Sequence, residues 1–226
     1  MPPDPIEHSK TLHNNPDYSL PSAYAIKKGI KGRMRLPSAL KKIYSSFEIN
    51  NFLDYGCGKN GLIDLLKKYE DFRSIEFTGY DPAVDQYSVK PNKSFDIVTC
   101  IDVLEHVSRQ QIPKTLLEID RLTSGFFFFA IDLIPAQKTL ADNRNAHIML
   151  APADWWCQQI TAQFSYTRFF QAGKFESEEK FPLHLFGWAT NAAKHQSMAN
   201  TFFDSIEILS KEWILDSDKY TFVRWK

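Results

Sequence analysis

Short apolar runs alternate with amphipathic stretches over residues 37–132. Four runs, each closed by glycine or polar residues, predict strands at residues 51–55, 75–80, 95–101 and 125–132. Before and between them, apolar side chains recur every three or four residues, which predicts helices near residues 37–47, 62–69 and 112–122. Strands that are apolar on both faces and alternate with helices indicate a parallel sheet joined by right-handed crossovers. Ligands bind such sheets outside the carboxyl ends of the strands.

The pattern changes at two places. Residues 81–94 are too few for the usual helix, strand and loop, so one unit of the doubly wound sheet is predicted to be truncated. After residue 150 we expect a helix at 152–160, a strand at 164–170 and two strands around a polar turn within 205–226. The predicted fold is therefore α/β, doubly wound and Rossmann-like, with a mainly parallel sheet and an antiparallel C-terminal strand.

The two ends of the chain differ in composition. Five of the twelve prolines fall within residues 1–21, where apolar residues are sparse, so residues 1–33 are predicted to form an N-terminal tail or lid. Residues 34–226 are predicted to form a single domain, since the length suits one sizeable α/β unit.

Charge and cysteine usage exclude several classes of function. Lysine and arginine (27) balance aspartate and glutamate (27), so no overall field favours nucleic acid or an anionic membrane. The three cysteines, Cys57, Cys100 and Cys157, are far apart and have no histidine at ligand spacing beside them, so neither a disulfide framework nor a metal site is expected. The longest apolar run is too short to span a bilayer, and the expected location is the cytoplasm.

A glycine-rich turn follows the first predicted strand. Gly56, Gly58 and Gly61 have the G-x-G-x-x-G spacing of dinucleotide-binding loops, in which a helix N-terminus faces the ligand. Asp54 precedes this turn, and its carboxylate would repel a diphosphate but would suit a ligand with an ammonium or sulfonium group. This charge argues against NAD.

Three segments in order, "LDYGCGKNG", "FTGYDPAV" and "KSFDIVTCIDVLEHV", resemble the motifs of class I S-adenosylmethionine-dependent methyltransferases. The resemblance implies S-adenosylmethionine as cofactor, with Asp54, Gly56 and Gly58 along its methionine part. It also implies that Asp81 accepts hydrogen bonds from the ribose, as an acidic residue about 20 residues after the glycine turn commonly does. The predicted cofactor-binding residues are Asp54, Tyr55, Gly56, Cys57, Gly58, Tyr80, Asp81, Pro82, Ile101 and Asp102.

The chain departs from the family pattern at two positions. Asn60 stands where the family has a further glycine, and asparagine is the residue after glycine that best tolerates a positive φ angle. The short stretch 82–94 has no clear acidic partner for adenine, which leaves Asp85 or the backbone near Ser88 as candidates.

Two histidines are the predicted catalytic residues. His106, in "DVLEH", could act on the acceptor as base or hydrogen-bonding partner, or could make only a structural hydrogen bond. His147 lies in a polar segment after the fourth predicted strand and is a second candidate base.

The segment around His147 supplies the predicted acceptor site. Asn143 and Arg144 are candidates to bind an anionic or hydroxylated substrate, and Trp155 or Trp156 could stack on a sugar or pack in the core. "RNAHIMLAPADWW" also resembles small bacterial methyltransferases of saccharide or surface-polysaccharide modification. Acceptor-site elements are expected near residues 133–156 and 171–200.

Within the second acceptor region, residues 179–188 are expected to cap the acceptor pocket or to form a surface excursion. His184, in that stretch, is expected to lie outside the site.

The predicted function is S-adenosylmethionine-dependent methyl transfer to an oxygen or nitrogen of a small molecule, such as a saccharide or its precursor. Two alternatives remain: a non-catalytic, methyltransferase-like binding module and, from the glycine spacing alone, an NAD-dependent oxidoreductase.

Overall fold

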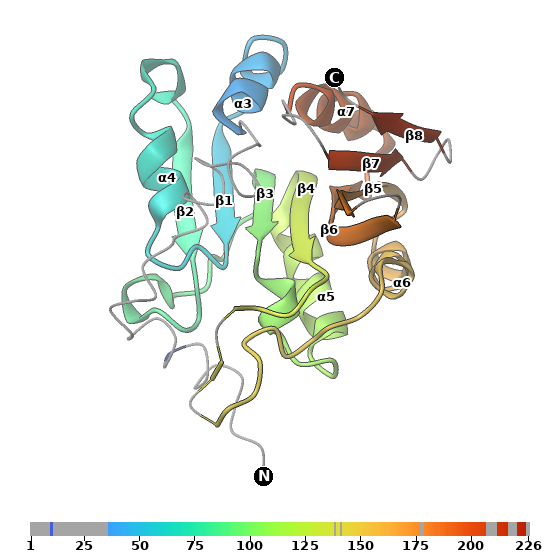
Figure 1. Cartoon of the computed structure of the whole chain (residues 1–226). Helices are drawn as coiled ribbons and strands as arrows, with labels where there is room; N and C mark the ends of the chain where they lie inside the picture. Colours follow the sequence, from blue (N-terminus) through green and yellow to red (C-terminus); the bar gives the residue numbers. More distant parts are fainter. Residues whose placement is uncertain are drawn as a thin grey trace.

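The computed structural model describes Lys10 and residues 36–137, 139–140, 142–176, 179–206, 212–216 and 221–224; the rest of the predicted tail or lid lies outside the described residues. Within these residues, eight strands form one sheet in the order β2-β1-β3-β4-β6-β5-β7-β8 (Figure 1). The strands are β1 (Asn51–Tyr55), β2 (Glu76–Tyr80), β3 (Phe95–Ile101), β4 (Thr123–Asp132), β5 (Tyr166–Glu176), β6 (Glu179–Thr190), β7 (Glu212–Asp216) and β8 (Thr221–Arg224).

The first half of the sheet is parallel, as the apolar runs predicted. Strands β2, β1, β3 and β4 pair in parallel, and each lies within one or two residues of its predicted bounds. Residues 81–94 hold only the short 3-10 helix η2 (Asp85–Tyr87) and no strand, which leaves β2 at the edge of the sheet. The predicted truncation of one unit is therefore confirmed.

The second half of the sheet is antiparallel and larger than predicted. The C-terminal pair β7 and β8 was expected, and it extends the sheet beyond β5. However, residues 179–188 are neither a cap nor a surface excursion, because β6 runs antiparallel between β4 and β5. A Cβ at Gly187 would lie 2.1 Å from the Arg168 carbonyl oxygen, so this strand needs glycine where it approaches β5. Glycine and proline in this stretch hid the strand pattern from the sequence.

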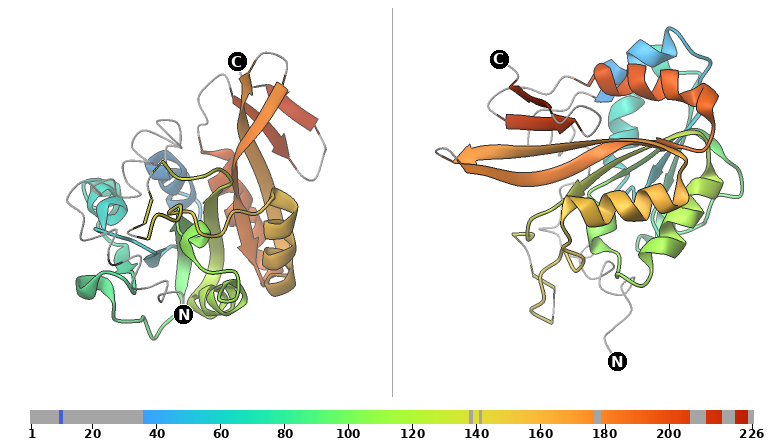
Figure 2. Two further views of the ribbon diagram at one scale, coloured as in Figure 1. Left: turned by 60° about the horizontal axis from the view of Figure 1, so that its bottom comes forward. Right: turned by 90° about the vertical axis from the view of Figure 1, so that its right-hand side faces the viewer.

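Helices cover both faces of the sheet, which makes the fold doubly wound (Figure 2). One face packs against α3 (Leu36–Tyr44), α4 (Gly61–Leu66) and α7 (Gln196–Asp204), and the other against α5 (Ile112–Leu122) and α6 (Ala153–Gln163). In β4, Phe126 and Phe128 face the first layer while Phe127 and Phe129 face the second, and all four are fully buried. Burial on both faces explains why this strand is a continuous apolar run.

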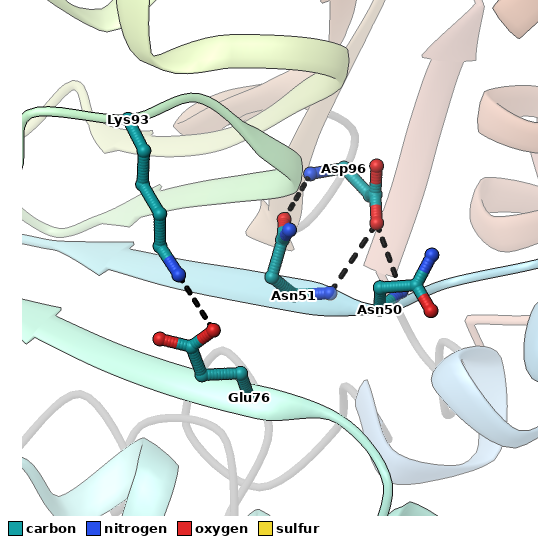
Figure 3. Close-up of polar contacts among 5 residues, drawn as sticks. All are labelled: Asn50, Asn51, Glu76, Lys93 and Asp96. Carbon is teal, nitrogen blue, oxygen red and sulfur yellow. Dashed lines mark hydrogen bonds and ion pairs between the residues drawn. The ribbon is translucent and has the colours of Figure 1, made fainter.

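Polar contacts at the amino ends of the strands hold their register (Figure 3). The Asp96 carboxylate accepts hydrogen bonds from the backbone N–H groups of Asn50 and Asn51 at 2.8 and 3.3 Å, and the Asp96 N–H donates to Asn51 Oδ1 at 2.7 Å. Lys93, two residues before β3, places its Nζ 2.5 Å from Oε2 of Glu76, the first residue of β2. These contacts align β1, β2 and β3, so the polar residues that follow them meet at the opposite, carboxyl edge.

Among the described helices, none combines the length and apolar character that crossing a membrane requires.

Candidate functional site

The glycine loop between β1 and α4 is a tight turn against the neighbouring strands. Gly56 and Gly58 have positive φ angles of 80° and 52°. The N–H groups of Gly56 and Cys57 donate to the Tyr80 carbonyl at 2.7 and 3.1 Å, which ties the loop to the end of β2. A Cβ on Gly56 would come within 2.3 Å of a Val103 methyl carbon. Only glycine at position 56 allows the glycine loop to lie this close to the segment after β3.

Asn60 preserves this turn where the family pattern has glycine. Its φ angle is 63°, in the left-handed region that asparagine tolerates, and α4 begins at the next residue. The side chain of Asn60 lies beside Gly79, where a Cβ would meet Asn60 Oδ1 at 2.4 Å. The expectation that asparagine can take this position is confirmed.

Asp54 is a buried carboxylate at the end of β1. Thr99 Oγ1 donates to Asp54 Oδ1 at 3.0 Å, whereas Asp54 Oδ2 has no hydrogen-bond donor within the described part of the chain. Burial raises the pKa of Asp54 to about 7; the Thr99 hydrogen bond opposes this rise, and the Asp81 carboxylate adds to it. When Asp54 is ionised, its Oδ2 therefore has no hydrogen-bond donor among the described residues to offset the negative charge.

Asp81, at the end of β2, braces the loop from the other side. Its two carboxylate oxygens accept hydrogen bonds from the N–H groups of Gly58 and Ala83, both at 2.9 Å. Asp81 and the glycine loop are thus brought together as the sequence predicted. Asp85 and Ser88, the candidates for adenine, are exposed in and next to η2.

The other predicted cofactor residues beside the loop turn their side chains away from solvent. The Tyr55 hydroxyl donates to Glu118 Oε1 on α5 at 3.2 Å, and the Tyr55 ring packs against Tyr80 with centroids 5.3 Å apart. The buried or half-buried residues of this group are Tyr55, Cys57, Tyr80, Pro82 and Ile101.

The "DVLEH" segment turns sharply after β3. Asp102 has a positive φ of 54°, and its N–H donates to the Ala130 carbonyl at 3.0 Å. The 3-10 helix η3 (Leu104–His106) follows and buries Glu105 completely. Glu105 Oε1 accepts the Asp132 N–H at 2.9 Å, and no described residue donates to Glu105 Oε2. Burial raises the pKa of Glu105 well above its usual range, and the Asp102 and Asp132 carboxylates raise it further.

The structure brings the two predicted catalytic histidines together. Their ring centroids are 5.0 Å apart and the rings are nearly perpendicular, at 80°. His106 Nδ1 lies 2.8 Å from the Ala146 carbonyl, and His147 Nδ1 lies 2.6 Å from the Ile134 carbonyl. Because a carbonyl only accepts, each Nδ1 carries the hydrogen, and each Nε2 is the basic nitrogen.

Asn145 fixes the loop that carries His147. Its side-chain oxygen accepts the N–H groups of Ala136 and His147, both at 2.9 Å, and its Nδ2 donates to the Ala136 carbonyl at 2.8 Å. The Met149 N–H also donates to the Glu105 carbonyl at 2.9 Å. The loop after β4 is thereby held against the "DVLEH" segment.

Sequence reasoning missed three residues of this edge: Glu105, Asp132 and His184. His184, which the sequence placed outside the site, is buried on β6 and pairs with Asp132 at the end of β4. Asp132 could have been found, since it is the last residue of a predicted strand, whereas Glu105 stands beside His106 but owes its importance to burial, which no local pattern shows. His184 could not have been found, because its strand was not recognised.

The predicted acceptor-binding side chains lie farther out. Asn143 is exposed with a φ of 62°, and the exposed Arg144 has its Nε 2.7 Å from Asp142 Oδ2. Trp156 is fully buried, as its core alternative required, and Trp155 packs edge-on against it with ring centroids 4.9 Å apart.

Comparison with known proteins identifies the family of the chain and supports its fold. A family model described as a methyltransferase domain matches residues 26–177. No curated protein sequence matches the chain. The fold resembles the plantazolicin methyltransferase BamL in complex with a triazolic desmethylPZN analog and SAH (TM-score 0.50, 16% identity), over 83% of this chain and 96% of that chain. It also resembles the plantazolicin methyltransferase BpumL in complex with SAH (TM-score 0.50, 9% identity), over 83% and 95% of the two chains.

Proposed function

The chain belongs to the methyltransferase domain family and is an S-adenosylmethionine-dependent methyltransferase, and from this premise we propose that its acceptor is a small molecule bound beside His106 and His147. The methyl group is transferred to an oxygen or nitrogen of that molecule. The glycine loop, Asp54 and Asp81 form the cofactor half of the site. The histidine pair and the loop after β4 form the acceptor half.

The unpartnered oxygen of Asp54 is the observation that carries this proposal. A buried carboxylate oxygen without a donor is costly, and a positively charged ligand would offset this cost, whereas a diphosphate would be repelled by the carboxylate. The methionine part of the cofactor carries both an ammonium and a sulfonium group. The positive φ angles of Gly56 and Gly58 allow the tight turn that brings the loop backbone to this edge of the sheet, where such a ligand would lie.

Asp81 is suited to the ribose of the same cofactor. Its carboxylate is fixed at the loop by the Gly58 and Ala83 N–H groups. Ribose hydroxyls donate hydrogen bonds, and an acidic side chain at the end of the second strand is the usual acceptor in folds of this kind. Asp54 and Asp81 would thus hold two different parts of one molecule.

When bound, the cofactor would supply a methyl group on sulfur. The acceptor atom would bond to the methyl carbon as the carbon–sulfur bond breaks, the electron pair of the broken bond would stay on sulfur, and the acceptor's proton would pass to solvent. The chain contributes position, because such displacement requires the acceptor to be held in line. His106 and His147 are fixed by the Ala146 and Ile134 carbonyls, so their basic nitrogens have defined places in the acceptor half.

The prediction of a saccharide acceptor rests only on the resemblance of residues 144–156 to methyltransferases of saccharide modification. Arg144 is paired with Asp142 and Trp156 is buried in the core, so neither supports a sugar-binding surface. The acceptor is therefore proposed as a small molecule with a nucleophilic oxygen or nitrogen, without restriction to sugars. A panel of alcohols, phenols, amines and saccharides assayed for methyl transfer would define it.

Calorimetry with S-adenosylhomocysteine tests the cofactor half. We expect the native protein to bind it and Asp81→Ala to weaken binding at least tenfold, because both the loop brace and the ribose acceptor are lost. Asp71→Ala is the matched control, since Asp71 is an exposed carboxylate in η1 (Glu70–Phe72) and is not among the predicted cofactor-binding residues, and the affinity of this variant should match that of the native protein. Failure of the native protein to bind would refute the proposal.

A further inference from the structure

We propose that Glu105, His106 and His147 form a binding site for a divalent transition-metal ion in the acceptor half of the site. One potential ligand atom from each of the three side chains lies within 4.8 Å of the other two. The sequence predicted no metal site, because its cysteines have no histidine at ligand spacing beside them. The fold joins the two histidines through the loop after β4, whose Met149 N–H bonds to the Glu105 carbonyl.

Glu105 supplies the buried anionic ligand. It has no exposed surface, and its Oε1 accepts the Asp132 N–H while its Oε2 has no donor among the described residues. A carboxylate oxygen buried in this way has lost its hydration without gaining a hydrogen-bond donor, which is energetically unfavourable. A cation bound at Oε2 would remove that cost.

The two histidines have the hydrogen-bonding arrangement that metal ligands usually have. Each donates its Nδ1 hydrogen to a backbone carbonyl, of Ala146 or Ile134, which fixes both the ring orientation and the tautomer. Metal-binding histidines are commonly held by such a carbonyl or carboxylate on the nitrogen that does not bind the metal. With this tautomer, Nε2 is the ring nitrogen that can act as a metal ligand in both histidines.

Further carboxylates give this edge a negative charge that favours a cation. Asp102 and Asp132 each place an oxygen within 4.8 Å of an oxygen of Glu105 and of each other. His184 pairs with Asp132 from β6. Two imidazoles and a carboxylate suit ions such as Mn²⁺, Fe²⁺ or Zn²⁺ better than Ca²⁺, which prefers oxygen ligands alone.

This site suggests how the acceptor is activated, an inference that rests on the proposed function. Three protein ligands leave coordination positions open, and an ion there lowers the pKa of a bound hydroxyl. The acceptor atom is then an oxygen, of an alcohol or phenol, and not an amine nitrogen. His106 and His147 serve as ligands in this account, and not as the general bases that the sequence predicted.

Manganese binding tests the site without any acceptor. Protein stripped with a chelator is titrated with Mn²⁺, and the electron paramagnetic resonance signal of free Mn²⁺ reports binding. We expect about one ion per native chain. Glu105→Gln and His147→Ala should each weaken binding at least tenfold, because each removes one of three ligands. His195→Ala is the matched control, since His195 lies in η4 (Ala193–His195), near Asp96 at the opposite edge, and its binding should equal the native value.

Two outcomes would overturn the inference. One is a native protein that binds S-adenosylhomocysteine but neither Mn²⁺ nor, in a parallel calorimetric titration, Zn²⁺. The other is binding that survives unchanged in both Glu105→Gln and His147→Ala, with circular dichroism showing both variants folded. Because S-adenosylhomocysteine is titrated separately, loss of the metal site is distinguished from failure of the proposed function.

Discussion

At the residue scale, Asp54 links stability to ligand binding. Its pKa is raised from 3.8 to about 7 by burial, so between these pH values the folded protein keeps a proton that the unfolded chain has lost. The stability that this group contributes is therefore fully present below pH 3.8 and is lost as the pH rises through about 7. Above pH 7 the native protein carries a buried charge that only a ligand compensates.

The variant Asp54→Asn should separate the effect of the buried charge on stability from its effect on ligand binding. The amide oxygen can still accept from Thr99, but the uncompensated charge is gone, so we expect the ligand-free variant to be about 1–3 kcal/mol more stable than native at pH 8. Near pH 4 this gain should vanish. At pH 8 its affinity for S-adenosylhomocysteine should fall at least tenfold. Urea unfolding at both pH values and calorimetry measure these changes.

Asp71→Asn serves as the control because it removes the same charge from an exposed position. It should leave both the pH dependence of unfolding and the affinity near native values. If Asp54→Asn were less stable than native at pH 8 and bound the ligand equally well, the role assigned to Asp54 would be wrong.

Single residues also show which parts of the candidate site could be predicted from the sequence and which could not. Asp54, Asp81 and Asn60 were predicted because each has a fixed place relative to a strand end or a glycine turn. Glu105 was not singled out, because its importance comes from complete burial next to Asp132, and burial depends on packing between segments distant in sequence.

At the element scale, the parallel strands could be predicted and the antiparallel ones only in part. Strands buried on both faces produce uninterrupted apolar runs, of which β4 is the clearest. The β6 sequence carries glycine, proline and histidine, residues that usually mark turns or surface loops. Its place between β4 and β5 depends on close backbone approach, which no local pattern reveals.

Gly187→Ala tests the position of β6. The added Cβ would meet the Arg168 carbonyl oxygen at 2.1 Å and the Phe129 ring at 2.9 Å, so the strands must separate. We expect a loss of at least about 2 kcal/mol in the free energy of unfolding, measured in urea. Thr167→Ala, on the adjacent strand and only half-buried, should cost less than about 1 kcal/mol. Equal stability of Gly187→Ala and the native protein would show that β6 does not pack in this way.

At the scale of the whole molecule, the polar side chains of the candidate site lie together at one edge of the sheet. Register contacts at the amino ends of β1, β2 and β3 align the strands, and the carboxyl ends then present Asp54, Asp81, Glu105 and the histidine pair together. The antiparallel extension contributes His184 to the same edge. The fold thus places a cofactor half and an acceptor half side by side, joined where Gly56 meets Val103.

A crystal structure of the native protein with S-adenosylhomocysteine bound tests this arrangement most directly. The account predicts the ligand's amino acid part beside the glycine loop, with Asp54 Oδ2 in contact with its ammonium group, its ribose on Asp81, and its sulfur facing the His106–His147 pair. A ligand bound elsewhere, or one that leaves Asp54 Oδ2 without a partner, would contradict it.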